Sequence, residues 1–376
     1  MKILVDENIP YAHKIFSRLG DVQIIHGRKI TAQIVSSYDA LIVRSVTNVN
    51  QSLLEGSKVR FVGSTTSGID HIDDHWLEKS GIKFSYAAGC NAIAVVEYVF
   101  TALLLLSQRY GFHLRDKTVG IIGVGNIGRL LYQRLNAFGV PTLLCDPPQA
   151  EISTIGEWQL LEKLVTEADV LTLHTPLTYH GRHATWHLIN EDLLSALPST
   201  KRILINTCRG AVVDNVALLH ALKKGKLLSV ILDVWEKEPN LSLSLLNNVD
   251  IGTAHIAGYS LEGKVRGAIK IFNDYSKFLG AIQSLNVSAF LPAPMIEYVR
   301  WHGVINEEEL RKLAYLIYDL QFDDILLRRN IHKPHGFDQL RTNYCERREW
   351  SSLSVGTDNN ISTNMLNQLG FKSILI

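Results

Sequence analysis

Three charged or titratable residues that could carry chemistry stand just beyond successive apolar segments in the second half of this sequence. They are Arg209, Glu238 and His255, and doubly wound parallel sheets bind their ligands beyond the carboxyl ends of such strands. An arginine fork matches a carboxylate, a histidine exchanges a proton near neutral pH, and a neighbouring glutamate can orient the imidazole. Together they suit the oxidation of a hydroxyl beside a carboxylate. Singly, each also fits a structural role: a helix cap, a solvated turn charge before Pro239 and a hydrogen-bonded core histidine.

A glycine-rich segment, GVGNIG at 123–128, fits the pattern GxGxxG between a predicted strand and a predicted helix. Gly123, Gly125 and Gly128 would let the backbone approach a pyrophosphate, and the helix N-terminus supplies unpaired N–H donors. Asp146 ends the next predicted strand, where a carboxylate accepts hydrogen bonds from ribose hydroxyls and repels a 2′-phosphate. The segment therefore predicts a dinucleotide site that prefers NAD to NADP. The alternative is a glycine turn that only packs a helix on a sheet.

The elements that must position these residues form two series, in which short apolar segments alternate with helical stretches. The predicted strands are 3–5, 22–25, 40–43, 59–62 and 82–84 in the first series, and 118–122, 142–145, 169–173, 202–206, 228–233 and 249–252 in the second. Such alternation predicts parallel sheets covered by helices. The apolar stretch 92–108 is too long for a strand and predicts a connecting helix, and another helix is expected over 261–280.

The segment after the second series differs in character. Pro292 and Pro294 indicate a linker, followed by an amphipathic helix near 307–320 and an apolar terminus at 374–376. The predicted fold class is α/β, with two doubly wound parallel-sheet domains, one flavodoxin-like and one Rossmann, plus a small C-terminal α+β domain. The predicted domains comprise residues 1–111 with 257–286, residues 112–256, and residues 287–376.

Composition narrows the class of protein. The chain has 376 residues, 46% hydrophobic and 20% charged, which is typical of a folded globular protein. Its net charge of +1 provides no basic field for nucleic acid. The most apolar stretch, 98–106, is shorter than the roughly 20 residues of a membrane span. The N-terminal segment shows no export signal, and the cysteines form no CxxC pair. We therefore expect a cytoplasmic protein without nucleic-acid or membrane partners.

No metal site is predicted from the histidine clusters. His180, His183 and His187 have no suitably close cysteine or carboxylate along the chain, so a solvated loop is the favoured interpretation. The cluster at 71–75 is typical of an acidic helix start. The charged segment ERREW at 346–350 is interpreted as a surface helix, with a subunit interface or a phosphate contact as alternatives.

Four motifs together resemble the D-isomer-specific 2-hydroxyacid dehydrogenases. They are GVGNIG at 123–128, NTCRGAVVD at 206–214, DVWEKEP at 233–239 and TAHIAG at 253–258, in the order and spacing of that family. One departure is Ala254, where the family commonly has proline. The resemblance covers essentially the whole chain. The segments 1–10, 89–100, 144–148 and 346–352 narrow it to a branch that acts on a phosphorylated substrate.

The resemblance assigns roles to individual residues. It implies that Arg209 holds the substrate carboxylate, that His255 takes the proton of the C2 hydroxyl, and that Glu238 steadies His255. Positions that match the cofactor contacts of the family are Asn126, Ile127, Thr175, Thr207, Cys208, Asp233 and Gly258, besides the glycines and Asp146.

Positions that match the substrate contacts are Ser45, Thr66 and Tyr259. The residues themselves are compatible with a phosphate near the first two, because Arg44 ends a predicted strand and the segment 65–68 offers hydroxyl and N–H donors before a probable helix. Without the resemblance, however, a Ser/Thr-rich helix cap with no ligand is the favoured interpretation.

The implied reaction is the NAD-dependent oxidation of 4-phospho-D-erythronate at C2 to (R)-3-hydroxy-2-oxo-4-phosphooxybutanoate, in vitamin B6 biosynthesis. The implied assembly is a homodimer that pairs through the C-terminal domain. Two alternatives stay open: a dehydrogenase for another phosphorylated 2-hydroxy acid such as 3-phosphoglycerate, and a non-enzymatic NAD-sensing binding protein, since one fold can serve unrelated functions. The presence of Arg209, Glu238 and His255 argues against the sensor.

Overall fold

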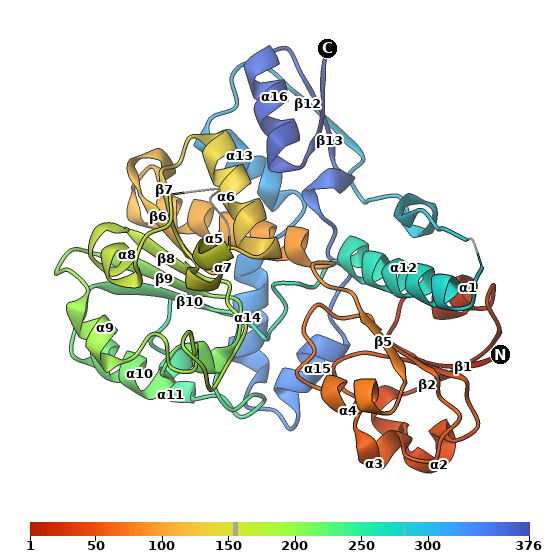
Figure 1. The fold of residues 1–376 in the computed structure, drawn as a ribbon. Coiled ribbons are helices and arrows are strands. Elements are labelled where there is room, and N and C mark those ends of the chain that lie inside the picture. The colour runs from red at the N-terminus through yellow and green to blue at the C-terminus, as the bar shows by residue number, and fades with distance from the viewer. Residues whose placement is uncertain (153–156, 282) are drawn as a thin grey trace. The chain divides into compact units, whose positions relative to one another are not determined.

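The computed structural model describes residues 1–152, 157–281 and 283–376 (Figure 1). The chain forms two compact units: unit 1 comprises Met1–Ala92 and Tyr259–Ala293, and unit 2 comprises Ile93–Gly258 and Pro294–Ile376. The chain therefore passes between the units three times, after Ala92, Gly258 and Ala293. The division into three domains stays a prediction.

Unit 1 contains a five-stranded parallel sheet in the order β2-β1-β3-β4-β5, which is the flavodoxin-like order. Its strands are β1 (Lys2–Asp6), β2 (Asp21–Ile25), β3 (Ala40–Val43), β4 (Phe61–Ser64) and β5 (Lys83–Tyr86). All five predicted strands are confirmed, although β4 begins two residues later than the apolar pattern indicated.

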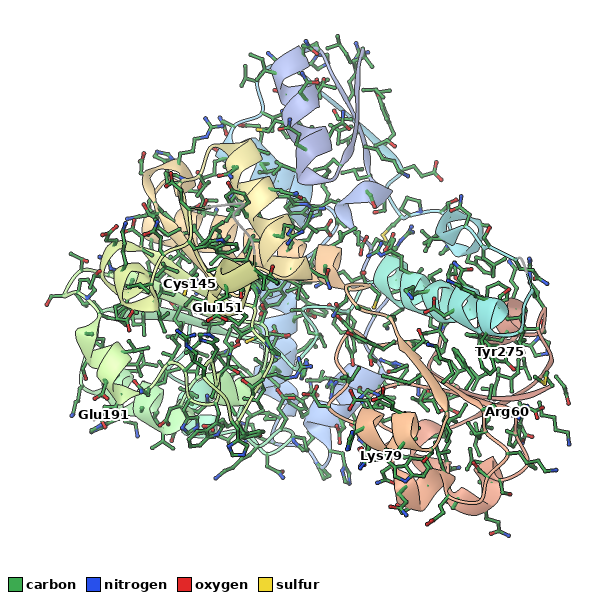
Figure 2. All side chains as sticks on the ribbon, in the orientation of Figure 1. Arg60, Lys79, Cys145, Glu151, Glu191 and Tyr275 are labelled. Atoms are coloured by element: carbon green, nitrogen blue, oxygen red, sulfur yellow. The ribbon has the colours of Figure 1, made fainter. Side chains whose placement is uncertain are left out.

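Alternating side chains give this sheet a hydrophobic core on each face. Ile3 and Val5 pack with α1 and α12 on one face, whereas Leu4 packs with α2, α3 and α4 on the other. Tyr275 of α12, labelled in Figure 2, lies with its ring centroid 4.8 Å from that of Phe61. The bounds of these helices are α1 (Ala12–Phe16), α2 (Ala32–Val35), α3 (Gln51–Leu54), α4 (Asp74–Lys79) and α12 (Leu261–Phe278).

Unit 2 contains a six-stranded parallel sheet in the order β11-β10-β9-β8-β6-β7. An isolated parallel bridge between Leu144 and Trp158 extends the sheet beyond β7, where a Rossmann fold has its third strand. The strand order therefore reverses between β6 and β8, the place where such folds bind dinucleotides. The strands are β6 (Val119–Ile122), β7 (Thr142–Cys145), β8 (Val170–Leu173), β9 (Arg202–Asn206), β10 (Leu228–Leu232) and β11 (Ile251–Gly252).

The helices around this sheet begin with the predicted connecting helix, α5. It is long and apolar enough to cross a bilayer, but 72% of its most apolar 18-residue stretch is buried within the fold. The helices are α5 (Ala92–Tyr110), α6 (Asn126–Phe138), α7 (Pro147–Ile152), α8 (Leu161–Glu167), α9 (Glu191–Ala196), α10 (Asn215–Lys223) and α11 (Leu243–Leu246).

The C-terminal segment adds a small parallel sheet in the order β12-β13-β14. The helix predicted over 307–320 is divided, because Asp319 accepts a hydrogen bond from Phe322 N and begins a new helix. Leu327 and Phe337, from α14 and α15, enter the core of the six-stranded sheet. The elements are β12 (Tyr298–Trp301), α13 (Glu307–Tyr315), α14 (Leu320–Asn330), α15 (Gly336–Thr342), β13 (Ser354–Thr357), α16 (Asn360–Leu369) and β14 (Lys372–Leu375).

The prediction of a surface helix over 346–350 is wrong. Residues 344–349 are not helical, and Arg347, Glu349 and Trp350 are buried. Trp350 stacks on Phe371 with ring centroids 4.9 Å apart, and its backbone N–H donates to the buried carboxylate of Glu97. The charges of this segment meet polar partners inside the fold, and a sequence pattern cannot show such partners.

Candidate active site

Arg209, Glu238 and His255 stand beyond the carboxyl ends of β9, β10 and β11, which are neighbours in the six-stranded sheet. All three side chains line one pocket of about 370 Å³. Tyr179 and Trp186, which the sequence analysis did not select, line the same pocket. The structure thus brings the three predicted catalytic residues together at the edge of the sheet where doubly wound folds bind ligands.

His255 and Glu238 form a close pair. His255 Nδ1 lies 2.7 Å from Glu238 Oε2, and Glu238 Oε1 accepts a hydrogen bond from Trp235 N at 2.8 Å. Burial disfavours the charged form of Glu238, but the charge and hydrogen bond of His255, the N–H of Trp235 and the charge of Arg341 together outweigh it. The pKa of Glu238 therefore lies below its usual value. A glutamate held as carboxylate at Nδ1 fixes the ring orientation and leaves Nε2 for proton transfer.

Arg209 is positioned by the turn that follows β9. Its backbone oxygen accepts a hydrogen bond from the side chain of Asn206 at 2.9 Å, and its Nη1 donates to Cys208 O at 2.8 Å. The next residue, Gly210, lies against the turn after β10: a Cβ there would stand 2.0 Å from the backbone of Trp235. Glycine is therefore required for the turns that carry Arg209 and Glu238 to approach each other.

Asp233 organises the segment that carries His255. Its buried carboxylate accepts hydrogen bonds from the Thr253 hydroxyl at 2.6 Å and from Ile256 N and Ala257 N at 2.7 and 2.9 Å. One of these bonds precedes His255 in sequence and two follow it, and together they hold its backbone in the left-handed conformation, with φ of 56°. This role was not predicted for Asp233, whose predicted contact with the nicotinamide stays a prediction.

The glycine-rich segment has the geometry that a dinucleotide pyrophosphate needs. Gly125 precedes α6, and no described side chain caps that helix. A Cβ at Gly125 would meet none of the described atoms within 4 Å, whereas at Gly128 it would lie 2.0 Å from Gly123 O. The backbone therefore leaves open space at the N–H groups of Asn126 and Ile127 while the helix packs closely on the sheet. These residues fit NAD.

The other predicted cofactor residues lie along the same edge of the sheet. Asp146 follows β7, and its Oδ2 accepts a hydrogen bond from Val124 N of the glycine loop at 2.7 Å. Thr175 follows β8, with its Oγ1 4.0 Å from Cys208 Sγ, while Thr207 and Cys208 follow β9. Burial raises the pKa of the Cys208 thiol, so it stays protonated near neutral pH and suits packing rather than nucleophilic chemistry.

The predicted substrate residues Ser45, Thr66 and Tyr259 all belong to unit 1. Two cations flank the ring of Tyr259: the Arg44 guanidinium lies 5.9 Å from the ring centroid and Lys264 Nζ lies 5.1 Å from it. This concentration of positive charge suits an anion.

The helix predicted after 65–68 begins at Asp74, where Asp73 caps it, so the residues 65–68 do not themselves form its N-terminus. The Thr66 hydroxyl instead donates to Gly68 O at 2.9 Å and lies 2.7 Å from Ser64 Oγ. The acidic residues of the 71–75 cluster do begin a helix, as predicted.

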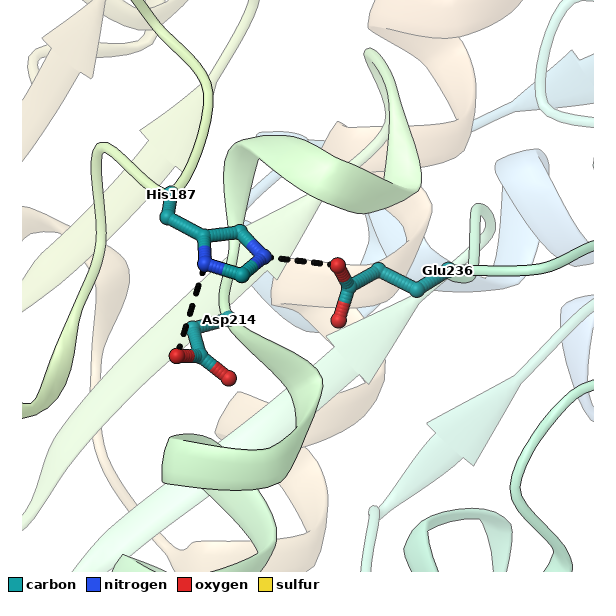
Figure 3. A group of neighbouring side chains, drawn as sticks. All are labelled: His187, Asp214 and Glu236. Atoms are coloured by element: carbon teal, nitrogen blue, oxygen red, sulfur yellow. Dashed lines mark hydrogen bonds and ion pairs between the residues drawn. The ribbon is translucent and has the colours of Figure 1, made fainter.

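The histidine-rich loop has carboxylate partners that the sequence did not indicate. His183 Nε2 lies 3.0 Å from Glu151 Oε1, and His187 stands between two carboxylates, with Nε2 2.7 Å from Glu236 and Nδ1 3.5 Å from Asp214 (Figure 3). These carboxylates are far away along the chain, so sequence spacing could not reveal them. The two carboxylates of His187 face opposite ring nitrogens, which is the geometry of an ion-pair bridge rather than of a shared metal ion.

Comparison with known proteins identifies the family of this chain. Residues 105–257 match the family described as D-isomer specific 2-hydroxyacid dehydrogenase, NAD binding domain, and residues 290–370 match a domain of unknown function. The chain is 62% identical to an erythronate-4-phosphate dehydrogenase of Sodalis glossinidius (strain morsitans), over 99% of both chains. It is 58% identical to the protein of that name from Serratia proteamaculans (strain 568), again over 99% of both.

A solved structure supports the fold of the larger part of the chain. D-Lactate dehydrogenase from Aquifex aeolicus, complexed with NAD and lactic acid, superimposes with a TM-score of 0.60 at 24% identity, covering 74% of this chain and 95% of that one. The likeness confirms the two doubly wound sheets as the fold.

Proposed function

This chain belongs to the erythronate-4-phosphate dehydrogenases, within the D-isomer specific 2-hydroxyacid dehydrogenases, and we propose that it oxidises 4-phospho-D-erythronate at C2 to (R)-3-hydroxy-2-oxo-4-phosphooxybutanoate. It is an NAD-dependent dehydrogenase of the pyridoxal phosphate pathway. The observation that carries the substrate chemistry is the convergence of Arg209, Glu238 and His255 in one pocket.

His255 and Glu238 together handle the proton. Because Nδ1 of His255 is bound to Glu238, Nε2 is the atom that accepts the proton of the C2 hydroxyl. NAD, when held by the glycine-rich segment, would supply the acceptor for the C2 hydride, so that the products would be the 2-oxo acid, NADH and one proton. Glu238 balances the positive charge that His255 acquires, which is why a carboxylate is needed at this position.

In this proposal, Arg209 binds the substrate carboxylate and donates a hydrogen bond to the C2 oxygen. Its guanidinium can bind a substrate carboxylate through two parallel N–H donors, which fixes the plane of C1 and C2. A donor aimed at the C2 oxygen also stabilises the charge that develops there as the bond to hydrogen breaks. Arg209 thus holds the substrate and polarises the carbon–oxygen bond.

The residues of the nucleotide site would hold NAD as the glycine geometry indicates. We propose pyrophosphate contacts from Asn126 and Ile127 N–H groups and ribose contacts from Asp146. We also propose contacts along the same strand ends from Thr175, Thr207, Cys208, Asp233 and Gly258.

In this proposal, residues of unit 1 bind the phosphate of the substrate. Ser45, Thr66 and Tyr259 contact the substrate, and Arg44 and Lys264, which flank the ring of Tyr259, provide the compensating charge. Paired cations suit a phosphate dianion better than an uncharged chain end. A substrate without the phosphate should therefore bind much more weakly.

A direct assay tests the proposed reaction. Purified protein is given NAD with 4-phosphoerythronate or with 3-phosphoglycerate, with and without an added 2-oxo acid that can reoxidise bound NADH. We expect turnover with 4-phosphoerythronate. Turnover only with 3-phosphoglycerate would keep the mechanism and overturn the substrate, whereas silence with both despite NAD binding would favour the sensor.

We further propose a cytoplasmic homodimer that pairs through the C-terminal segment 287–376. Tyr298, Ile374 and Leu375, on the outer strands β12 and β14, are each about half exposed, and exposed apolar side chains are frequent at interfaces. Light scattering of the purified protein should give twice the 42.2 kDa mass of one chain. Ile374→Lys should shift that mass towards the monomer.

A further inference from the structure

Arg347 is a buried cation that lies outside the site described above. It belongs to the non-helical segment 344–349, and 5% of its surface is exposed. Its Nη2 donates hydrogen bonds to two backbone carbonyls, Ala94 O at 3.0 Å and Ala257 O at 2.6 Å. One nitrogen of the C-terminal segment therefore joins two stretches of backbone that are remote in sequence.

Both carbonyls lie where the chain passes between the two units. The first passage follows Ala92, just before Ala94, and the second follows Gly258, just after Ala257. The two acceptors thus mark the two ends of the part of unit 2 that carries the catalytic residues. Arg347 ties these ends together from within unit 2.

The position of the guanidinium is itself held firmly. It lies over the ring of Tyr318, 4.3 Å from the centroid, and the Tyr318 hydroxyl donates to Asp323 Oδ2 at 2.9 Å. A buried guanidinium carries a large desolvation cost that an apolar side chain of similar size would avoid. This cost favours a role for Arg347 that depends on its hydrogen bonds, beyond filling space.

The bond to Ala257 O also reaches the catalytic segment. Ala257 N donates to Asp233, whose carboxylate organises the backbone on both sides of His255, and Ala257 O accepts from Arg347. Because a trans peptide points its C=O and N–H in opposite directions, the bond also directs the N–H of Gly258 away from Arg347. Both backbone polar atoms of Ala257, which lies between His255 and the passage to unit 1, therefore have a hydrogen-bond partner.

We propose that Arg347 is a positioning residue for the dehydrogenase reaction, which ties together the two backbone connections at Ala94 and Ala257. Through these two hydrogen bonds it fixes the position of the backbone around His255 relative to the backbone at Ala94. The inference rests on the proposed function, and it gives the C-terminal segment a part in turnover that is separate from subunit pairing.

The test compares Arg347→Met and Arg347→Lys with the unchanged protein. Turnover is measured with 4-phosphoerythronate, NAD affinity by fluorescence, and hydrogen–deuterium exchange at peptides 90–96 and 255–261, with strand β6 as the internal reference. In Arg347→Met we expect kcat to fall by about 10²-fold, because a displacement of about 1 Å costs this much. We expect NAD affinity to be unchanged and exchange to rise by at least about tenfold at both peptides but not in β6. Arg347→Lys keeps the charge and one donor, so it should recover part of kcat.

Tyr344→Phe is the matched control. It removes a hydrogen bond to Asp323 in the same cluster but touches neither Ala94 O nor Ala257 O. It should leave kcat and the exchange of both peptides close to those of the unchanged protein. Normal kcat and unchanged exchange in Arg347→Met would overturn the proposal, as would an exchange increase spread evenly over unit 2, which indicates a merely structural role.

Two further outcomes are distinguishable. If Arg347→Met does not fold, Arg347→Lys carries the test alone: faster exchange confined to the two peptides supports the proposal, and wild-type exchange with wild-type kcat overturns it. If the unchanged protein does not turn over 4-phosphoerythronate, the exchange experiment still decides whether Arg347 ties the connections, because it needs no substrate. Only the proposed function then fails.

Discussion

Two histidine–carboxylate pairs lie at a single turn of unit 2. They differ in one feature, which supports the proposed catalytic role of one pair and a structural role for the other. The turn after β10 carries both Glu236 and Glu238. Glu238 lies 2.7 Å from His255, and Glu236 lies 2.7 Å from His187. Both histidines also have positive φ, at 56° and 50°. The two pairs therefore have the same histidine–carboxylate distance and a similar backbone conformation at the histidine.

The second ring nitrogen distinguishes them. Nδ1 of His187 faces Asp214, whose other oxygen caps α10, and the ring stacks on Trp186 with centroids 3.8 Å apart. Nε2 of His255 has no hydrogen-bond partner among the described residues, and the side chain lines the pocket. A histidine with one nitrogen available can move a proton, whereas one with both nitrogens engaged is an anchor. His187 therefore fixes the loop that carries Trp186 to the turn that carries Glu238.

The largest contrast should appear in turnover. We expect His255→Asn to lower kcat by about 10²–10⁴-fold, since it removes the proposed general base. His187→Asn should lower it by less than about tenfold, since it removes only an anchor. Steady-state kinetics with 4-phosphoerythronate check this, with NAD binding as the control for folding. Equal losses in the two variants would break the comparison.

A smaller contrast is expected between the two glutamates. Glu238→Gln should lower kcat by about 10–10²-fold, because the amide no longer balances the charge that His255 gains. Glu236→Gln keeps a hydrogen-bond acceptor for His187 and should leave kcat nearly unchanged. The same kinetic assay separates them. A greater loss in Glu236→Gln would place the proton chemistry at His187 instead.

Much of this arrangement was predictable from the sequence, and for a clear reason. Buried parallel strands appear as continuous apolar segments, so β6, predicted over 118–122, was found at Val119–Ile122. The ends of such strands then indicate where ligands bind, which directed attention to Arg209, Glu238 and His255. Their catalytic roles stay predictions, but the sequence alone was enough to suggest that the three residues lie close together.

The remainder was not predictable because it depends on contacts between distant parts of the chain. Glu236 lies in the same motif as Glu238, yet nothing in the spacing shows that it meets His187. Charged residues are mostly exposed, so the segment around Arg347 was expected on the surface. Its partners are backbone carbonyls at Ala94 and Ala257, which carry no signal in the sequence pattern.

The variants His187→Asn and His255→Asn should rank in the opposite order when the loss in free energy of unfolding is compared instead of the loss in kcat. His187→Asn leaves Glu236 and Asp214 without their shared partner. Loss of the partly buried hydrogen bond to Glu236 and of the ion pair with Asp214 should cost about 1–3 kcal/mol of the free energy of unfolding. His255→Asn breaks one bond at a partly exposed side chain and should cost less than about 1 kcal/mol. Urea unfolding of both variants measures the difference. A larger loss in His255→Asn would contradict the division of roles.

The smallest effect is expected in the pH dependence of stability. The pKa of Glu238 in the folded protein lies below its ordinary value of 4.5, so the folded state releases this proton more readily than the unfolded state does. The stabilisation is therefore fully present above pH 4.5 and is lost as the pH falls through the folded pKa. Glu238→Gln cannot titrate and should show a shallower loss of stability on the acid side, while both proteins keep the same slope near neutral pH. Urea unfolding between neutral and acid pH measures the slopes, and an unchanged acid slope in the variant would mean that the charge of Glu238 contributes nothing to holding His255.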